Sequence, residues 1–131
     1  QEKIITPQWT AYCPGYFKLG RKIIHCWNPK GHGKLDLYGA IKNSCNVYFL
    51  QLGLKIGLDI WTKYSKLFRF GQPTGIDLPG EAPGLVPTRA YYNKIYGKNG
   101  WTKGNLANLA IGQGELLTTP IQIAQYVMIL A

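Results

Sequence analysis

The stretch KNSCNVYFLQLG, residues 42–53, joins a small polar triplet to a long apolar run. Apolar residues recur at helical spacing through this run, and they predict a helix from about Cys45 to Ile56. Because this helix is apolar on nearly every side, we expect it to be buried. A buried helix requires other elements around it, so the stretch predicts a globular domain rather than a disordered chain.

The triplet Ser44-Cys45-Asn46 places a hydroxyl, a thiol and a carboxamide where this helix begins. Side chains at its first and third positions can point out of one rim of the first turn. The Ser44 hydroxyl can donate and accept a proton, and the Asn46 carboxamide can donate to a carbonyl and accept from an amide N–H, which suits a peptide-like ligand. The alternative is that Ser44 serves only as the N-cap of the helix, where serine is common.

Pro and Gly residues divide the chain into four regions. Residues 1–34 are loop-rich, with interleaved aromatic residues, and have room for a short hairpin. Residues 35–70 are expected to form helices, which carry the Ser-x-Asn triplet. Residues 71–118 are expected to be loops with short extended pieces, and residues 119–131 are expected to form a final helix.

Capping residues mark the expected helix starts. Asp36 and Asp59 are expected to cap two helices of region 35–70. The final helix has the stronger signal, because Thr119 at the N-cap, Pro120 at the first position and Gln122 two residues later form a capping box. One face of this helix is apolar and carries Ile121, Ala124, Val127 and Met128.

The charge balance is strongly basic, since 15 Lys and Arg residues face 6 Asp and Glu residues and give a net charge of +9. These charges contain no run of five or six, so a solvated basic surface is the simplest interpretation. The longest apolar stretch, PIQIAQYVMILA, is shorter than the roughly 20 residues of a membrane span. The chain stops inside this apolar pattern, and we expect it to be a piece of a longer protein.

Three segments, in one order, resemble the transpeptidase domain of class B penicillin-binding proteins, and most closely the elongation type, penicillin-binding protein 2. They are GHGKLDLYGAIKNSCNVYFLQLGLKIG, FGQPTGIDLPGEAPGLVPT and LANLAIGQGELLTTPIQIAQ. The resemblance covers essentially the whole chain. It implies an α/β (α+β) serine transpeptidase, β-lactamase-like fold with two subdomains, of which this chain would be the mainly helical middle, with long loops and few short strands.

The same resemblance implies a serine-type peptidoglycan D,D-transpeptidase that cross-links stem peptides through an acyl-enzyme and binds penicillin. Of the three family motifs, only Ser-x-Asn is present, because the chain contains neither Ser-x-x-Lys nor Lys-Ser/Thr-Gly. Ser44 would relay a proton to the leaving amine, and Asn46 would hold the substrate amide. Without the nucleophile of Ser-x-x-Lys, the chain alone is expected to be inactive.

The resemblance also implies the setting of the longer protein. Its ligands would be peptidoglycan stem peptides and β-lactams, and its partner a cell-elongation glycosyltransferase. It would lie on the periplasmic side of the bacterial inner membrane, anchored by an upstream segment. Within AIGQGELLTTPIQIAQ, which forms a turn and a buried helix in the family, we expect Gln113 and Thr118 to be structural residues.

The three cysteines allow more than one arrangement. Cys13 and Cys26 can form a disulfide while Cys45 is buried as a free thiol, or all three can be free. With His32 they instead make a Cys₃His set suited to structural zinc, and His25 is a spare candidate. We favour zinc because it uses every thiol, because the GHG turn brings His32 close to Cys26 in sequence, and because the irregular region 1–34 needs something to fix it. The family resemblance is compatible with this, since it implies relatives with Asp or Cys at the first two positions.

Two further functions are open at this point. One is a noncatalytic scaffold that keeps the fold. The other is a basic, zinc-stabilised nucleic-acid-binding module, which the net charge and the Cys/His set permit. Against the second, the apolar helix leaves no basic recognition face and the ligand spacing fits no zinc finger. We therefore expect no nucleic-acid partner.

Overall fold

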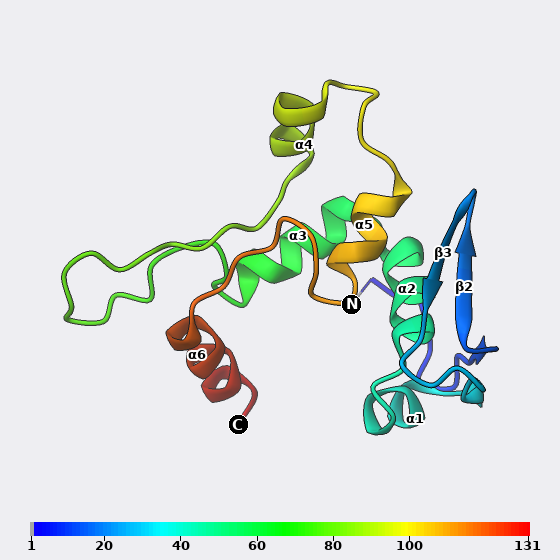
Figure 1. The fold of residues 1–131 in the computed structure, drawn as a ribbon. Helices are drawn as coiled ribbons and strands as arrows, with labels where there is room; N and C mark the ends of the chain where they lie inside the picture. Colours follow the sequence, from blue (N-terminus) through cyan, green and yellow to red (C-terminus); the bar gives the residue numbers. More distant parts are fainter. Residues whose placement is uncertain (1) are drawn as a thin grey trace. The chain divides into compact units, whose positions relative to one another are not determined.

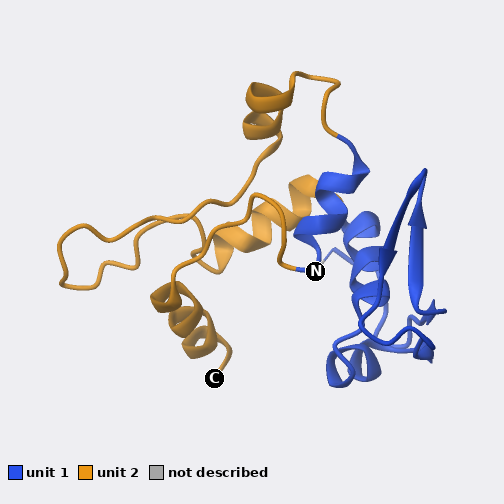
Figure 2. Cartoon of the chain, in the orientation of Figure 1, with its two compact units in different colours: residues 1–56, 102–111 blue, residues 57–101, 112–131 orange. Residues whose placement is uncertain are grey.

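The computed structural model describes residues 2–131 of the chain (Figure 1). It has two compact units, each built from segments far apart in sequence (Figure 2). Unit 1 comprises Gln1–Ile56 and Thr102–Ile111, and unit 2 comprises Gly57–Trp101 and Gly112–Ala131. None of the helices within the described residues is both long and apolar enough to cross a bilayer.

Unit 1 contains two small antiparallel sheets. β1 (Ala11–Cys13) pairs with β4 (Gly33–Leu35), and Ala11 lies opposite Leu35. β2 (Tyr16–Leu19) pairs with β3 (Lys22–His25) in a hairpin. The short hairpin expected in this region is therefore present, and a second strand pair brings its two ends together.

Helix α2 (Asn46–Ile56) is the centre of unit 1. Its residues Val47, Tyr48, Leu50 and Gly53 are buried, which confirms the burial expected from its apolar sequence. α5 (Lys103–Leu109) packs against it. The approach is close, because a Cβ at Gly53 would collide with the Cβ of Ala110. Only glycine therefore fits at this crossing.

The short helix α1 (Leu37–Lys42) precedes α2. Asp36 caps it as predicted, since its Oδ1 accepts a hydrogen bond from the Gly39 N–H at 2.8 Å. The hydrophobic cluster beneath α1 and α2 joins Ala11, Cys13, Cys26, Ala40, Cys45, Val47 and Tyr48. All three cysteines thus belong to one core.

Unit 2 contains α3 (Leu58–Leu67), α4 (Arg89–Tyr96) and α6 (Pro120–Leu130). The prediction that Asp59 caps α3 is wrong, because Gly57 takes the N-cap position and makes no side-chain cap. Asp59 lies one residue inside the helix, and its carboxylate accepts two hydrogen bonds from Arg89, at 3.2 and 2.7 Å.

The prediction that residues 71–118 are loops is also wrong in part, since this region contains α4 and α5. Both helices start at a threonine cap that follows a proline or an aromatic residue. The Thr88 hydroxyl accepts from the Tyr91 N–H at 3.0 Å, and Thr102 forms a capping box with Asn105. These caps stabilise the first turns of α4 and α5, two helices that the surrounding Gly and Tyr residues do not predict.

Helix α6 begins with the predicted capping box between Thr119 and Gln122. Gln122 is 1% exposed, and its amide also donates to the carbonyls of Gln72 and Pro83, both at 2.8 Å. It therefore ties the Pro/Gly-rich loop to the start of the helix. The rest of α6 is not buried as the family resemblance implied, and Met128 is 76% exposed.

Candidate functional site

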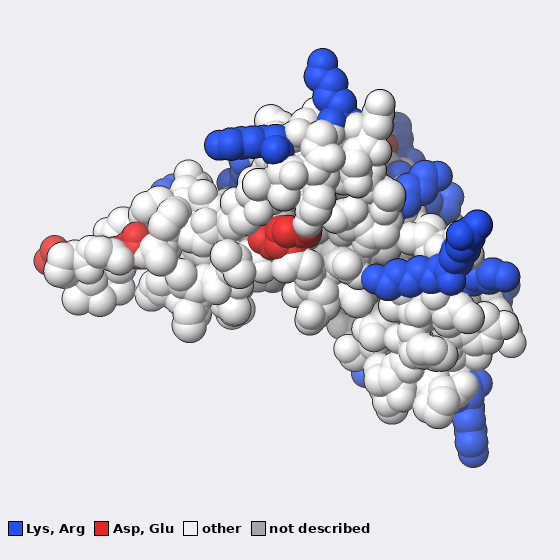
Figure 3. All heavy atoms as spheres, turned by 45° about the horizontal axis from the view of Figure 1, so that its top comes forward, with Lys and Arg blue, Asp and Glu red and all other residues white. Residues whose placement is uncertain are grey.

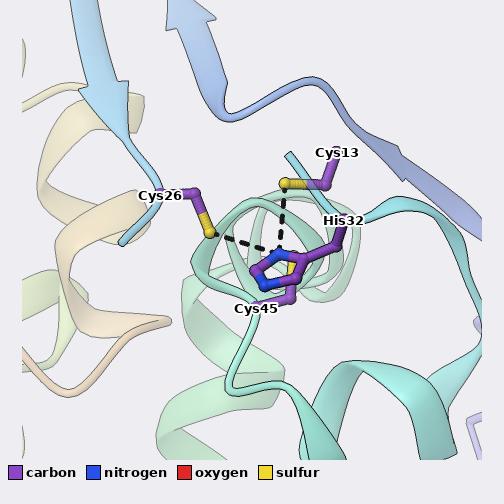
Figure 4. Close-up of side chains that lie close together, drawn as sticks. All are labelled: Cys13, Cys26, His32 and Cys45. Carbon is purple, nitrogen blue, oxygen red and sulfur yellow. Dashed lines mark hydrogen bonds between the residues drawn. The ribbon is translucent and has the colours of Figure 1, made fainter. Parts of the chain in front are cut away.

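Cys13, Cys26, His32 and Cys45 form one cluster in unit 1, as the Cys₃His interpretation predicted. Their ligand atoms all lie within 4.8 Å of one another. The Sγ atoms of Cys13 and Cys26 are each 3.6 Å from His32 Nδ1. Figure 4 shows the three thiols grouped around the imidazole ring. His25 is exposed and lies outside the cluster.

The two sheets bring these residues together. Cys13 ends β1, Cys26 follows β3, and His32 precedes β4. The loop ends are tied by backbone hydrogen bonds, from the His32 N–H to the Cys13 carbonyl at 3.0 Å and from the Cys26 N–H to the Gly15 carbonyl at 2.8 Å. Because Cys13 and His32 are linked through their backbones, their side chains meet on the same side.

A glycine makes this close approach possible. Gly31 has a φ of +78°, and a Cβ there would collide with the Cys13 carbonyl oxygen. Gly15 is equally constrained, with a φ of +97°, and a Cβ there would collide with the Pro29 carbonyl oxygen. The two loops can therefore fold over each other only with glycine at these positions.

The donor set fits a tetrahedral zinc ion. With Zn–S near 2.3 Å and Zn–N near 2.1 Å, neighbouring ligand atoms of a tetrahedron are separated by about 3.6–3.8 Å. The observed 3.6 Å between each sulfur and His32 Nδ1 matches this edge. His32 Nδ1 is therefore the ring nitrogen that faces the thiols. The other ring nitrogen, Nε2, is buried and has no hydrogen-bond partner among the described residues.

The cluster's thiols differ in acidity. Burial raises the pKa of the Cys45 thiol to about 12, so without a metal ion this thiol is protonated at neutral pH. For Cys26 burial acts in the same direction, but the backbone N–H groups of Asn28, Val47 and Asn46 outweigh it and lower the pKa of its thiol. Metal binding at this site must therefore displace the proton of Cys45.

The Ser-x-Asn triplet lies on the turn between α1 and α2. The Ser44 N–H donates to the Ile41 carbonyl at 3.1 Å, and the Cys45 N–H donates to the Ala40 carbonyl at 2.9 Å. This pair of bonds is the Schellman motif that ends α1. Asn43 is the C-cap of α1, and Ser44 follows it at the left-handed position of the motif, with a φ of +46°.

This placement rules out Ser44 as the N-cap of α2. The helix begins at Asn46, so Cys45 occupies the N-cap position and Ser44 precedes it. The Schellman position that Ser44 fills usually belongs to glycine, because a left-handed conformation costs an L-residue about 1–2 kcal/mol. Serine is therefore less stable than glycine at this position.

The three triplet residues point in alternate directions. Ser44 is exposed and Asn46 is half-buried, whereas Cys45 is fully buried among the metal-ligand candidates. One short turn thus presents the hydroxyl and the carboxamide on the outside and the thiol on the inside. Any ion bound by Cys45 would lie directly behind the Ser-x-Asn pair.

Sequence reasoning missed one residue at this site. The Trp27 indole N–H donates to the Asn43 carbonyl at 2.9 Å, and its ring lies 5.1 Å from that of His32. Its only sequence signal is its place next to Cys26. Gln113 and Thr118, expected to be structural, are both exposed, so neither contributes to the core of unit 2.

The basic residues do not mark a binding groove. Most Lys and Arg residues are in unit 1 and most acidic residues are in unit 2. On the face drawn in Figure 3, the Lys and Arg side chains project outward, and within unit 2 Arg89 pairs with Asp59 at 2.7 Å. This pattern agrees with a solvated basic surface.

Comparison with known proteins identifies relatives across the whole chain. The model of the penicillin binding protein transpeptidase domain matches residues 1–131. The peptidoglycan D,D-transpeptidase MrdA of Haemophilus influenzae is 39% identical over 131 residues, which are 98% of this chain and 20% of that protein. MrdA of Escherichia coli K12 is 34% identical over 129 residues, 97% of this chain and 20% of that protein. The chain therefore spans about a fifth of the length of these curated relatives.

Solved structures agree. The crystal structure of Pseudomonas aeruginosa PBP2 in complex with WCK 5153 has a TM-score of 0.90 and 36% identity, and the match covers 98% of this chain and 28% of that one. PBP2 from Helicobacter pylori also has a TM-score of 0.90 and 36% identity, with 97% and 24% covered. The serine transpeptidase, β-lactamase-like fold predicted from the sequence is confirmed.

Proposed function

The chain belongs to the penicillin binding protein transpeptidase domain family, and on that basis we propose that it is the Ser-x-Asn-bearing part of a peptidoglycan D,D-transpeptidase. The full-length protein that carries it, the parent protein, would cross-link stem peptides and be acylated by β-lactams. The relatives named above support this activity, since both are called peptidoglycan D,D-transpeptidases.

The proposed reaction is acyl transfer. A serine of Ser-x-x-Lys, outside this chain, attacks the carbonyl carbon between two D-alanine residues, and the C–N bond breaks. Ser44 passes a proton to the leaving amine, and Asn46 donates and accepts hydrogen bonds with the amide of the substrate. An acceptor amine then attacks the acyl-enzyme and restores the serine.

The observation that carries this proposal is the backbone of Ser44. A serine stands in the left-handed position of a Schellman turn, with a φ of +46°, where glycine would be more stable. The turn leaves Ser44 exposed beside Asn46. A noncatalytic scaffold of the same fold would have no need of a hydroxyl at this strained position.

Labelling with a fluorescent penicillin tests the activity. We expect the parent protein to be acylated, the 131-residue chain alone not to be, and Ser44→Ala to slow acylation by about 100-fold or more, the range of a lost proton relay. The matched control is Ser65→Ala, because Ser65 is the other serine of the chain and donates to the Trp61 carbonyl within α3.

Each result has a definite meaning for the proposal. A parent protein that is not labelled, or a Ser44→Ala variant that is acylated as fast as the Ser65→Ala control, contradicts the transpeptidase and favours the noncatalytic scaffold. Labelling of the isolated chain would show that the nucleophile lies within these 131 residues.

We also propose that Cys13, Cys26, His32 and Cys45 hold one structural zinc ion. The support is the fit between the 3.6 Å sulfur–nitrogen separations and the edge of a zinc tetrahedron. When bound, the ion would fix the loops of unit 1 and take no part in the chemistry. Elemental analysis of protein purified without chelator should give one zinc per chain, and thiol titration should find the cysteines protected until the metal is removed.

The opposite result would be metal-free protein with three reactive thiols, or with one thiol and a disulfide. Cobalt substitution offers an independent check, since sulfur ligation gives intense charge-transfer absorption. The control is His25→Ala, which removes the exposed histidine next to Cys26 and should leave the metal content unchanged.

The setting of the parent protein is proposed from its relatives. A structure of Helicobacter pylori PBP2 is a complex with MreC, and another related structure is described as a peptidoglycan synthase complex that coordinates polymerization and crosslinking. We propose that the parent protein pairs with a cell-elongation glycosyltransferase on the periplasmic side of the inner membrane. Protease digestion of spheroplasts should remove the domain, whereas intact cells should protect it.

A further inference from the structure

Trp27 contacts both the metal-ligand cluster and the turn that carries Ser44. Its indole N–H donates to the carbonyl of Asn43 at 2.9 Å, and its ring meets the His32 ring at a centroid distance of 5.1 Å and an angle of 60°. It directly follows Cys26 in the chain. One side chain thus connects a ligand loop to the peptide unit that precedes Ser44.

The exposure of Trp27 argues against a core role. The side chain is 64% exposed, so burial of its ring contributes little to the stability of unit 1. Its two specific contacts, with a backbone carbonyl and with the face of His32, are therefore the features that define its position.

The accepting carbonyl has a particular place in the turn. The Asn43 carbonyl belongs to the peptide unit whose rotation, together with the φ of Ser44, sets the direction of the Ser44 side chain. On its other side, Asn43 is tied to α1, because its backbone N–H and its side-chain amide both donate to the Gly39 carbonyl, at 3.0 and 2.8 Å. The hydrogen bond from Trp27 links this carbonyl to the ligand loop that contains Cys26.

We propose that Trp27 is a positioning residue for Ser44: its indole N–H holds the Asn43–Ser44 peptide unit in the orientation that presents the Ser44 hydroxyl. This inference rests on the proposed proton relay by Ser44. After Ser44, the N–H of Cys45 fixes the turn through its bond to the Ala40 carbonyl. Before Ser44, the indole of Trp27 fixes it through its bond to the Asn43 carbonyl. The strained φ of +46° is thereby fixed from both sides.

Loss of the indole N–H should affect the chemical step and not the binding of substrate. Asn46, which is proposed to hold the substrate amide, lies in α2, whereas the hydrogen bond and the ring contact of Trp27 go to Asn43 and His32. Removing one hydrogen bond from the turn should lower the acylation rate constant by about 3- to 10-fold. The dissociation constant of the encounter complex with the β-lactam should stay unchanged.

The experiment uses the parent protein, loaded with metal, and a chromogenic cephalosporin followed by stopped flow. Trp27→Phe keeps a ring against His32 and removes the donor. Replacement of Trp27 by benzothienylalanine, which has sulfur in place of the N–H, changes only the donor. Trp101→Phe is the matched control, because its indole donates to Asn93 Oδ1 at 2.8 Å in unit 2. Metal content and melting temperature are measured for each protein.

The result expected is a lower acylation rate constant for both Trp27 replacements, with metal content and melting temperature unchanged and with Trp101→Phe at the wild-type rate. Wild-type acylation by Trp27→Phe overturns the proposal. A decrease only in proportion to lost metal, or a decrease in Trp27→Phe without one in the benzothienylalanine protein, also overturns it, because ring packing would then be the cause. If Ser44→Ala itself acylates normally, the proposed function fails first.

Discussion

The Cys45 N–H donates to the Ala40 carbonyl at 2.9 Å, and this bond closes the turn that holds Ser44 at a φ of +46°. The same residue, Cys45, is fully buried and faces Cys13, Cys26 and His32. One cysteine therefore takes part both in a helix-ending turn and in the candidate metal centre. This dual role gives the loops of unit 1 a physical reason to be rigid where the Ser-x-Asn pair begins.

Substitution of Ser44 by glycine should stabilise the fold while it removes the hydroxyl. Glycine adopts a positive φ without the steric cost that a Cβ brings, so Ser44→Gly should be more stable than Ser44→Ala by about 1 kcal/mol. Urea unfolding of the parent protein measures the difference. Both variants should lose acylation alike. A Ser44→Gly variant less stable than Ser44→Ala would mean that the turn is not left-handed in solution.

The sequence predicted α2 well because nearly every position of that helix is apolar, and burial on all sides leaves a strong pattern. The predicted start at Cys45 was one residue early, since Cys45 belongs also to the Schellman turn of α1. The conformation of Ser44 was not predictable. Serine is not a usual left-handed residue, so nothing in its identity signals a positive φ.

The cluster of Cys13, Cys26, His32 and Cys45 was predictable from the sequence because the chain has only three cysteines and two histidines. Trp27 was not found, because its partner carbonyl lies 16 residues away and belongs to the backbone, which has no residue type to read. Helices α4 and α5 were missed because Tyr, Asn and Gly are weak helix formers, and their threonine caps decide the starts.

Removal of the proposed zinc ion should lower the melting temperature of the parent protein by about 10 °C, since a tightly bound ion stabilises the folded state by several kcal/mol. Cys45→Ala should lose the ion. Cys26→Asp should keep it, because a carboxylate also ligates zinc. Differential scanning calorimetry with and without chelator checks the shift, and added zinc, but not added magnesium, should restore it. An unchanged melting temperature would contradict a structural metal.

The loop of unit 2 that follows α3 should weaken in acid through Glu81. Its carboxylate accepts from the Thr74 hydroxyl at 2.6 Å and from the N–H groups of Thr74 and Gly75 at 2.7 and 3.1 Å. The Thr74 side-chain bond is the main cause that lowers the pKa of Glu81, aided by these backbone donors. A lowered folded-state pKa contributes stability above the unfolded-state value of about 4.3, and this contribution is lost as the pH falls through the folded-state value.

The melting temperature of Glu81→Gln tests this dependence. The variant should melt below the wild type at pH 7, and the gap should shrink as the pH falls below about 4. Asp77→Asn is the matched control, since it neutralises an exposed carboxylate of the same loop. A gap that is constant with pH, or equal in the two variants, would show that the Glu81 bonds do not form in solution.

Replacement of Gln122 by glutamate should unfold the junction between the loop and α6. The Gln122 amide donates to two carbonyls, those of Gln72 and Pro83, while its Oε1 accepts from the Thr119 N–H at 3.0 Å. Glutamate keeps the acceptor but loses both donors, and it places a negative charge against the carbonyl oxygens of Gln72 and Pro83. Each unsatisfied group costs about 1–3 kcal/mol, so Gln122→Glu should destabilise the parent protein by about 2–4 kcal/mol.

Gln125→Glu on the same helix is the comparison that isolates this effect, because it makes the same chemical change at a half-buried position one turn away. Urea unfolding should separate the two variants clearly, with Gln125→Glu within about 0.5 kcal/mol of the wild type. Equal stability of both variants would contradict the bonds to Gln72 and Pro83. Recovery of Gln122→Glu at low pH, where the carboxyl regains a proton to donate, would confirm that the missing donor causes the loss.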